Sequence, residues 1–196
     1  RKQQYQELLV APGHLRTSFY ALLDREIAHA AAGRPARVII KNNALTDIGC
    51  VRALYRASQA GVSADLIVRG ACVLRPGVPG LSDRIRVRSV VGRFLEHSRI
   101  YYFENGGDPA VYIGSADLME RNLDRRVEVL CRIAKPELVR DLRDHILETY
   151  LRDNDRAYVL GADGYTRVEP PIDETPLSAQ ETLLASYTHP DHVQEV

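Results

Sequence analysis

A strand–helix–strand pattern over residues 38–68 constrains the fold of this chain more than any other stretch. Residues 38–40 form a short, wholly apolar run typical of a strand buried in a sheet, and residues 64–68 form a second one. Between them, Asp47 can cap a helix that keeps helical apolar spacing and ends at Gly61. Such units place their two strands parallel through a right-handed crossover, so the pattern predicts an α/β fold.

A cation follows each of these strands directly. Lys41 comes after the first strand and Arg69 after the second. Because α/β folds bind ligands at the carboxyl ends of their strands, we expect the two cations side by side at one rim of the sheet. Residues 70–82, rich in Gly and Pro, are expected to form an irregular loop over that rim.

Residues 91–128 contain the side chains that best suit a phosphate ligand. His97 and Arg99 stand at the head of an apolar run, residues 100–103, that is predicted to be a strand. Side chains two residues apart on a strand share a face, so both can meet one ligand. Arginine offers a planar fork of donors to phosphate oxygens, and histidine can donate a hydrogen bond, move a proton or attack as a nucleophile.

Further along the same stretch, a second predicted strand leads into a small polar turn. Gly114-Ser115 would add backbone N–H groups and a hydroxyl at close approach. Glu104 is placed where a carboxylate could orient the His97 ring. Each part is common alone, so only the ordered set is informative.

The ordered set resembles a variant of the HxK…GSxN signature of the phospholipase D superfamily. Its members are His97, Arg99, Glu104, Gly114, Ser115, Asp117, Asn122 and Glu128. Arg99, Glu104 and Asp117 stand where the signature has lysine, aspartate and asparagine. The surrounding sequence, closely over residues 38–133, resembles more specifically the C-terminal catalytic domain of bacterial polyphosphate kinase, the long-chain polyphosphate-synthesising type.

This resemblance implies a fold and a reaction. In that family two phospholipase D-like domains face each other, and each supplies one histidine. The terminal phosphoryl of ATP passes reversibly to polyphosphate through a phosphohistidine in the preceding domain, outside this chain. His97 matches the second histidine and would bind phosphate and handle protons, while Arg69 matches the ATP and phosphate site. Arg75, Arg93, Arg99 and Ser115 are candidates for further polyphosphate contacts.

The resemblance also implies cofactors and partners. Magnesium is expected with ATP in the full-length enzyme, an ATP:polyphosphate phosphotransferase, although no carboxylate cluster in this chain marks a metal site. The expected partners are ATP or ADP, inorganic polyphosphate, the preceding domain of the same chain and further copies of the full-length protein. The isolated chain is expected to be inactive because the nucleophilic histidine lies outside it.

Composition bounds the remaining possibilities. The 196 residues carry 26 basic and 26 acidic side chains, which argues against nucleic-acid binding by bulk charge. Arginines crowd into residues 84–99, either as a patch for an anionic ligand or as solvated strand faces. The three cysteines form no CxxC pair, which indicates a reduced, cytoplasmic setting without a zinc site. Attachment to the inner membrane stays open, although no apolar run reaches the roughly 20 residues of a membrane span.

We therefore expect an α/β, phospholipase D-like domain over residues 1–153, with a central mixed β-sheet flanked by helices on both faces. A C-terminal extension, residues 154–196, would pack on it as a hairpin and a short helix. Residues 1–13 are expected to be a connector, after which Thr17 or Ser18 caps a helix that stops at Gly33. A start without methionine suggests a piece of a longer protein.

Two alternatives remain open at this point. One is a phospholipase D-like phosphodiesterase that acts as a homodimer, with His97 as the nucleophile. The other is a non-catalytic polyphosphate-binding module that depends on Arg86 and Arg88 rather than on His97.

Overall fold

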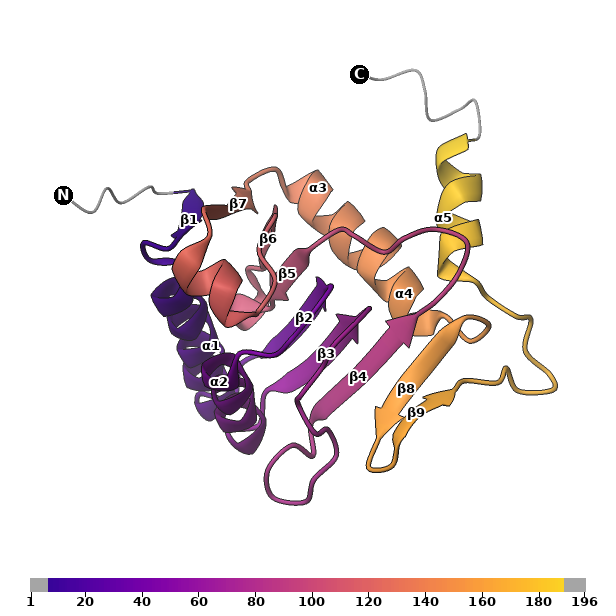
Figure 1. Ribbon diagram of the computed structural model, residues 1–196, viewed down its shortest axis with the longest axis horizontal. Coiled ribbons are helices and arrows are strands. Elements are labelled where there is room, and N and C mark those ends of the chain that lie inside the picture. Colours follow the sequence, from indigo (N-terminus) through magenta and orange to yellow (C-terminus); the bar gives the residue numbers. More distant parts are fainter. Residues whose placement is uncertain (1–6, 189–196) are drawn as a thin grey trace.

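The computed structural model describes residues 7–188 as helices around one nine-stranded sheet, in the order β1-β7-β6-β5-β2-β3-β4-β8-β9 (Figure 1). The strands are β1 Leu8–Ala11, β2 Arg37–Asn42, β3 Ser63–Val68, β4 Ile85–Val90, β5 Ile100–Phe103, β6 Ala110–Gly114, β7 Glu128–Ile133, β8 Ala157–Gly161 and β9 Gly164–Arg167. The helices are α1 Leu15–Ala31, α2 Ile48–Gln59, α3 Pro136–Arg140, α4 Glu148–Arg152 and α5 Ala179–Thr188. Short helical segments are η1 Asn105–Gly107, η2 Arg121–Arg125 and η3 Asp141–Leu147, the last of which joins α3 to α4.

Helices cover both faces of the sheet (Figure 1). On one face, α1 and α2 bury side chains such as Phe19 and Leu54 in the larger core cluster. On the other, the continuous helix from α3 to α4 buries Leu147 and Tyr150 in a second cluster. This arrangement confirms the predicted mixed sheet flanked on both faces. Within residues 7–188, no helix has the length and hydrophobicity needed to cross a membrane.

The strand–helix–strand unit forms as predicted. β2 and β3 run parallel, with Ile40 opposite Leu66. The Asp47 carboxylate accepts a hydrogen bond from the Cys50 N–H at 2.9 Å and so caps α2. Gly61 follows the helix with a positive φ of 97°, a conformation that favours glycine.

Strand directions define one edge of the sheet, which we call the rim. β4 is parallel to β3, whereas β5 is antiparallel to β2 and to β6. The carboxyl ends of β2, β3, β4 and β6 therefore meet the amino end of β5 at the same edge. The candidate residues that follow or precede these strands gather there.

Two expectations for the amino-terminal part are wrong. Instead of a connector, residues 8–11 form β1, which pairs antiparallel with β7 and satisfies the backbone of that strand. Helix α1 begins at Leu15, with His14 at the capping position, so neither Thr17 nor Ser18 caps it. The Thr17 hydroxyl instead donates to the His14 carbonyl at 3.0 Å. Residues 1–6 lie outside the described part of the chain.

Only the first part of residues 70–82, the loop expected over the rim, lies at the rim. Leu45 donates to the Ala71 carbonyl, and Val73 donates to the Leu45 carbonyl. The chain must then return to the opposite edge, because β4 is parallel to β3 and its first residue, Ile85, lies opposite Ala64. Most of residues 70–82 therefore run away from the rim.

The expected C-terminal hairpin and helix both form. β8 pairs antiparallel with β4, with Tyr158 opposite Ser89, so the hairpin continues the main sheet. Helix α5 packs Leu183 against the second core cluster. The expected extension beyond Thr188 lies outside the described residues.

We expect Asp47→Ala to lower the free energy of unfolding by about 3 kcal/mol. The substitution removes the cap of α2 and leaves Arg16, which donates to both Asp47 oxygens at 2.8 Å, without that partner. Urea unfolding checks this, with Asp24→Ala as the control because Asp24 pairs with Arg56 at the surface. Equal losses in the two variants would contradict the role of Asp47.

The same carboxylate predicts a pH dependence. Burial alone would raise the pKa of Asp47, but hydrogen bonds from Arg16 and Cys50 outweigh it and hold the pKa below its usual 3.8. The stabilisation is then complete well above pH 3.8 and is lost as the pH falls through the folded-state value. Asp47→Asn should lack this part of the acid-induced loss.

Candidate functional site

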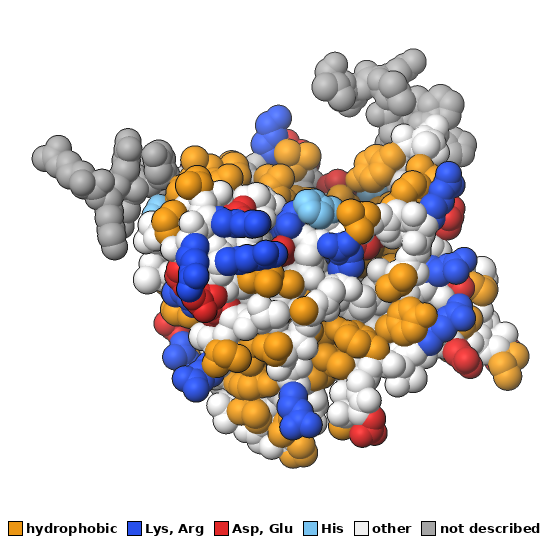
Figure 2. All heavy atoms as spheres, viewed as in Figure 1, with side chains coloured by type: hydrophobic (Ala, Val, Ile, Leu, Met, Phe, Trp, Pro, Cys, Tyr) orange, Lys and Arg blue, Asp and Glu red, His pale blue; other side chains and the backbone are white. Residues whose placement is uncertain are grey.

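The rim gathers most of the candidate residues. His97 and Arg99 precede β5, and Gly114 ends β6 beside them, with its N–H donating to the Arg99 carbonyl at 3.3 Å. Figure 2 shows basic side chains and a histidine close together on this face. His97 and Arg99 lie in irregular backbone, because β5 begins only at Ile100.

Arg99 is fixed by a nearly buried ion pair with Asp117. Its Nε lies 3.2 Å from one Asp117 oxygen and its Nη2 3.1 Å from the other. The two side chains are only 13% and 9% exposed. Asp117 also accepts from the Asn43 backbone N–H at 2.8 Å, which ties this pair to the end of β2. Arg99 therefore has one outward nitrogen, Nη1, left for other contacts.

That nitrogen faces His97. Arg99 Nη1 lies 3.1 Å from His97 Nδ1 and 2.9 Å from the His97 carbonyl oxygen. Nη1 also lies 3.4 Å from His97 Nε2, so the guanidinium packs against the imidazole ring and does not approach one ring nitrogen end-on. The two side chains lie in contact, but the expectation that they share a strand face is wrong, because β5 begins only after them. That both meet one ligand stays a prediction.

Glu104 does not orient His97. It follows the opposite end of β5, about 13 Å along the strand from His97, and accepts from the Tyr102 hydroxyl at 2.6 Å. The expectation from the signature is wrong here because the four-residue strand separates the two groups. Ser115 lies at the rim, where its hydroxyl accepts from the Val129 N–H at 3.2 Å.

Lys41 and Arg69 both end strands at the rim, as predicted, but only one of them is available to a ligand. Lys41 is 1% exposed, and its Nζ lies 2.7 Å from Glu96 and 2.8 Å from the Ser98 hydroxyl. Burial lowers the pKa of Lys41, while Glu96 opposes that shift. By contrast, the Nε of Arg69 is buried and has no hydrogen-bond partner among residues 7–188.

Arg69 opens onto a hollow of about 380 Å³ at the rim. Residues 90–96 form the rest of its lining, so Arg93 faces the same space as Arg69. Arg75 is not brought there. Its backbone N–H donates to the Tyr55 hydroxyl at 2.9 Å, about two turns along α2 from the rim.

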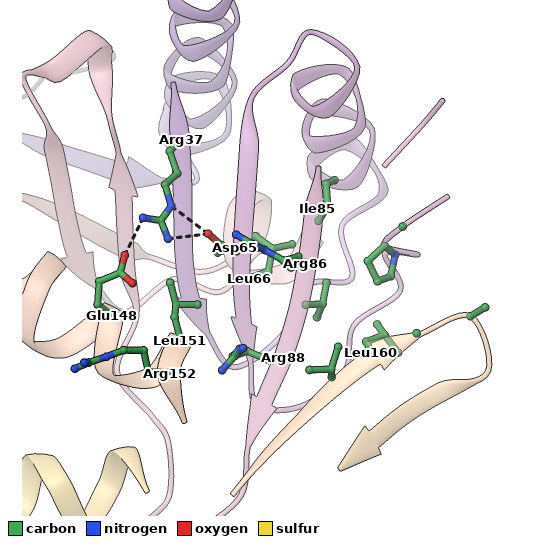
Figure 3. Close-up of a pocket in the computed structure, with 16 residues that line it drawn as sticks. Arg37, Asp65, Leu66, Ile85, Arg86, Arg88, Glu148, Leu151, Arg152 and Leu160 are labelled. Atoms are coloured by element: carbon green, nitrogen blue, oxygen red, sulfur yellow. Dashed lines mark hydrogen bonds and ion pairs between the residues drawn. The ribbon is translucent and has the colours of Figure 1, made fainter. Parts of the chain in front are cut away.

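The crowded arginines of β4 do not form one anionic-ligand patch with these residues. Arg86 pairs with Asp65 at 2.8 Å, and Arg88 donates to the backbone carbonyls of Tyr150 and Asp153. Figure 3 shows Arg86 and Arg88 beside a hollow of about 560 Å³, where Arg37 bonds both Asp65 and Glu148. These ion pairs form a network away from His97, in which the Arg86 side chain stays 76% exposed.

The carboxylates near the rim do not suit a magnesium ion. No group of three or more His, Cys, Asp or Glu side chains able to hold a metal occurs among residues 7–188. Glu96 is paired with Lys41, Asp117 with Arg99, and Glu128 accepts from the Asn122 amide at 2.6 Å. This part of the chain therefore supplies no set of free oxygen ligands.

The sequence interpretation missed two residues that hold the site together. Glu96 and Gln180 are both almost fully buried, and they bond to each other across α5 and the segment that carries His97. Glu96 stands between the apolar pair Phe94-Leu95 and His97, and neither this setting nor the sequence around Gln180 marks a buried polar group.

Comparisons with known proteins agree with this geometry. A family model described as polyphosphate kinase C-terminal domain 2 matches residues 8–180. The polyphosphate kinase of Thermosynechococcus vestitus is 54% identical over 186 residues, which are 94% of this chain and 25% of that protein. The chain thus spans about a quarter of the length of such relatives.

Solved structures give the same result. The crystal structure of polyphosphate kinase from Porphyromonas gingivalis matches with a TM-score of 0.89 and 40% identity, over 94% of this chain and 28% of that one. The phospholipase D family member Nuc from Salmonella typhimurium is 13% identical, with a TM-score of 0.52 over 71% of this chain and 89% of its own. The second match shows a shared fold and confirms the predicted phospholipase D-like architecture.

We expect Asp117→Asn to lower the free energy of unfolding by about 3 kcal/mol, because it leaves Arg99 nearly buried without a carboxylate. In the double variant with Arg99→Lys, the free energy of unfolding should fall by less than the sum of the losses in the two single variants. Urea unfolding of the four proteins measures this coupling. The exposed pair of Arg125 and Glu120 is the matched control, and an equally small loss in Glu120→Gln and Asp117→Asn would contradict the assignment.

Proposed function

Since this chain belongs to the polyphosphate kinase family as its C-terminal domain 2, we propose that it supplies half of the site that moves a phosphoryl group between ATP and polyphosphate. The reaction would be reversible and would pass through a phosphohistidine in the preceding domain, which would be the second half of the site. The activity belongs to the full-length protein, and we expect the isolated chain to bind phosphate groups without turnover.

The observation that carries this proposal is the guanidinium of Arg69, which lines the rim hollow and whose Nε has no hydrogen-bond partner among residues 7–188. The donor fork of arginine suits phosphate oxygens, and a phosphate in the hollow would meet this charge. Arg93 lines the same hollow and would add a second positive charge. Charges held in place before the reaction stabilise the transferring phosphoryl without reorganisation, which is the main source of catalysis in such transfers.

His97 would act as a hydrogen-bond donor and proton carrier. Its side chain is exposed beside Arg99, so a ring N–H could donate to a phosphate oxygen. The presence of Arg99 in place of the lysine of the phospholipase D signature argues against a self-sufficient phosphodiesterase with His97 as the nucleophile. Arg99 would pack against the ring and its positive charge would help to neutralise the phosphate, while Ser115 would add a contact at the rim.

A non-catalytic module based on Arg86 and Arg88 receives less support. They lie beside a different hollow from the one that Arg69 lines, and Asp65 and backbone carbonyls contact their guanidinium groups. The other expected partners follow from the proposal. Magnesium would enter with ATP and be held by groups outside the described residues, and the full-length protein would assemble as a homo-oligomer.

In the full-length protein, Arg69→Ala should lower the rate of polyphosphate synthesis from ATP by at least 100-fold, because it removes a charge-assisted contact to the transferring phosphate. Arg84→Ala is the matched control. It removes the same charge from an exposed arginine at the opposite edge, directly before β4, and should leave the rate within twofold. Equal rates in the two variants would overturn the role of Arg69.

His97→Ala should lower synthesis by about 100- to 1,000-fold in the same protein, the range expected for loss of a proton-handling group. A chromogenic phosphodiester, bis(4-nitrophenyl) phosphate, separates the main proposal from the phosphodiesterase. We expect no hydrolysis of this compound above background in either protein. Hydrolysis by the unmodified protein that disappears in His97→Ala would favour the phosphodiesterase instead.

A further inference from the structure

The segment that carries His97, residues 91–99, has exposed apolar side chains on its outer side and a buried side chain, Glu96, on its inner side. Leu95 is 70% exposed and Phe94 45%, whereas Glu96 between Leu95 and His97 is only 8% exposed. Residues 91–99 contain no helix or strand that would fix the backbone by itself. The position of His97 therefore depends on side chains from other elements.

The first of these side chains is Lys41 of β2. Its Nζ contacts Glu96 at 2.7 Å and the Ser98 hydroxyl at 2.8 Å, so it holds the residues on both sides of His97. It also lies 4.7 Å from the centre of the Tyr150 ring, where a cation is favoured. A buried ion pair of this kind adds little net stability but is costly to break, so it fixes one arrangement.

The second is Gln180 of α5. Its side-chain oxygen accepts from the Phe94 N–H at 2.8 Å, and its nitrogen donates to the Phe94 carbonyl at 2.8 Å. The same nitrogen donates to Glu96 at 2.5 Å. One amide thus satisfies both backbone groups of Phe94 and also the Glu96 carboxylate that Lys41 holds from the other side.

The backbone at Gly92 lies so close to this amide that a residue with a side chain would collide with it. A Cβ atom at Gly92 would lie 2.5 Å from the Gln180 side-chain oxygen, closer than any real contact, so a larger residue there would displace the amide. The start of α5 is itself fixed, because Asp153 accepts from the Ala179 N–H at 2.7 Å. Gln180 is 5% exposed and cannot move outward without breaking these bonds.

We propose that Gln180 is a positioning residue, through which helix α5 holds the His97 segment in the arrangement that phosphoryl transfer requires. The catalytic consequence rests on the proposed function, whereas the holding of the segment does not. A misplacement of about 1 Å in a reacting group can lower a rate by about 100-fold. Loss of the Gln180 amide should therefore lower the rate of phosphoryl transfer, even though Gln180 touches no substrate.

The test uses the full-length protein with Gln180→Leu, which keeps most of the side-chain volume and removes all three hydrogen bonds. Hydrogen exchange followed by mass spectrometry should show at least tenfold faster exchange of peptides covering residues 91–99. The kcat for polyphosphate synthesis should fall at least tenfold, with the KM for ATP within threefold. Gln59→Leu is the matched control, because that amide holds the Gly80 carbonyl in a loop away from the rim.

A second comparison distinguishes a local effect of Gln180 on residues 91–99 from a general loss of folding. Gly92→Ala should disturb residues 91–99 when Gln180 is present, by the clash with its oxygen. In the double variant with Gln180→Ala the clash is absent, so the double variant should be no worse than Gln180→Ala alone. Additive effects would mean that Gly92 acts independently of Gln180 and would overturn the proposal.

The outcomes distinguish the positioning role of Gln180 from the proposed function. Unchanged exchange of residues 91–99 in Gln180→Leu overturns the positioning role, and so does faster exchange with unchanged kcat. If His97→Ala and Arg69→Ala leave kcat unchanged, the proposed function fails, and the exchange data still decide whether Gln180 holds the segment.

Discussion

The directions of the central strands decide where chemistry can occur in this domain. Because β2, β3, β4 and β6 end where β5 begins, residues from five separate stretches of sequence meet at one rim. This convergence is a consequence of the two parallel pairings, since each forces the chain to return before the next strand starts. The same return carries Arg75 away from the rim, whereas Arg88 lies level with Lys41 in the sheet but donates to backbone carbonyls at the end of α4.

Within this site, Arg99 and Asp117 explain each other. Arg99 supplies a planar fork of donors, and Asp117 supplies the carboxylate that this fork fits. An uncharged residue at either position would leave a nearly buried charge without a partner. Together they fix the guanidinium and hold its remaining nitrogen against the ring and the backbone carbonyl of His97. The pair thus keeps a positive charge in place beside His97.

The sequence was informative where local chemistry decides the structure. Strand β2 followed by an Asp47 cap and a Gly61 stop could be predicted. It failed where pairing across the fold decides. Strand β1 exists because β7 has a free edge, and Lys41 is buried because Glu96 and Ser98 reach it from a segment more than fifty residues away. Glu104 matched the signature by spacing, yet the length of β5 keeps it from His97.

Buried polar groups explain why the site needs the whole domain and not only its signature. Lys41, Glu96 and Gln180 come from a strand, an irregular segment and the last described helix, and each would be destabilising without the other two. An exposed histidine on irregular backbone could adopt many positions, but this network leaves its neighbours one arrangement. Because His97 is exposed, it can reach a ligand. The buried Gln180 amide and the Lys41–Glu96 ion pair hold the backbone beside it in place. A site of this kind is therefore encoded in residues far from the motif that identifies it.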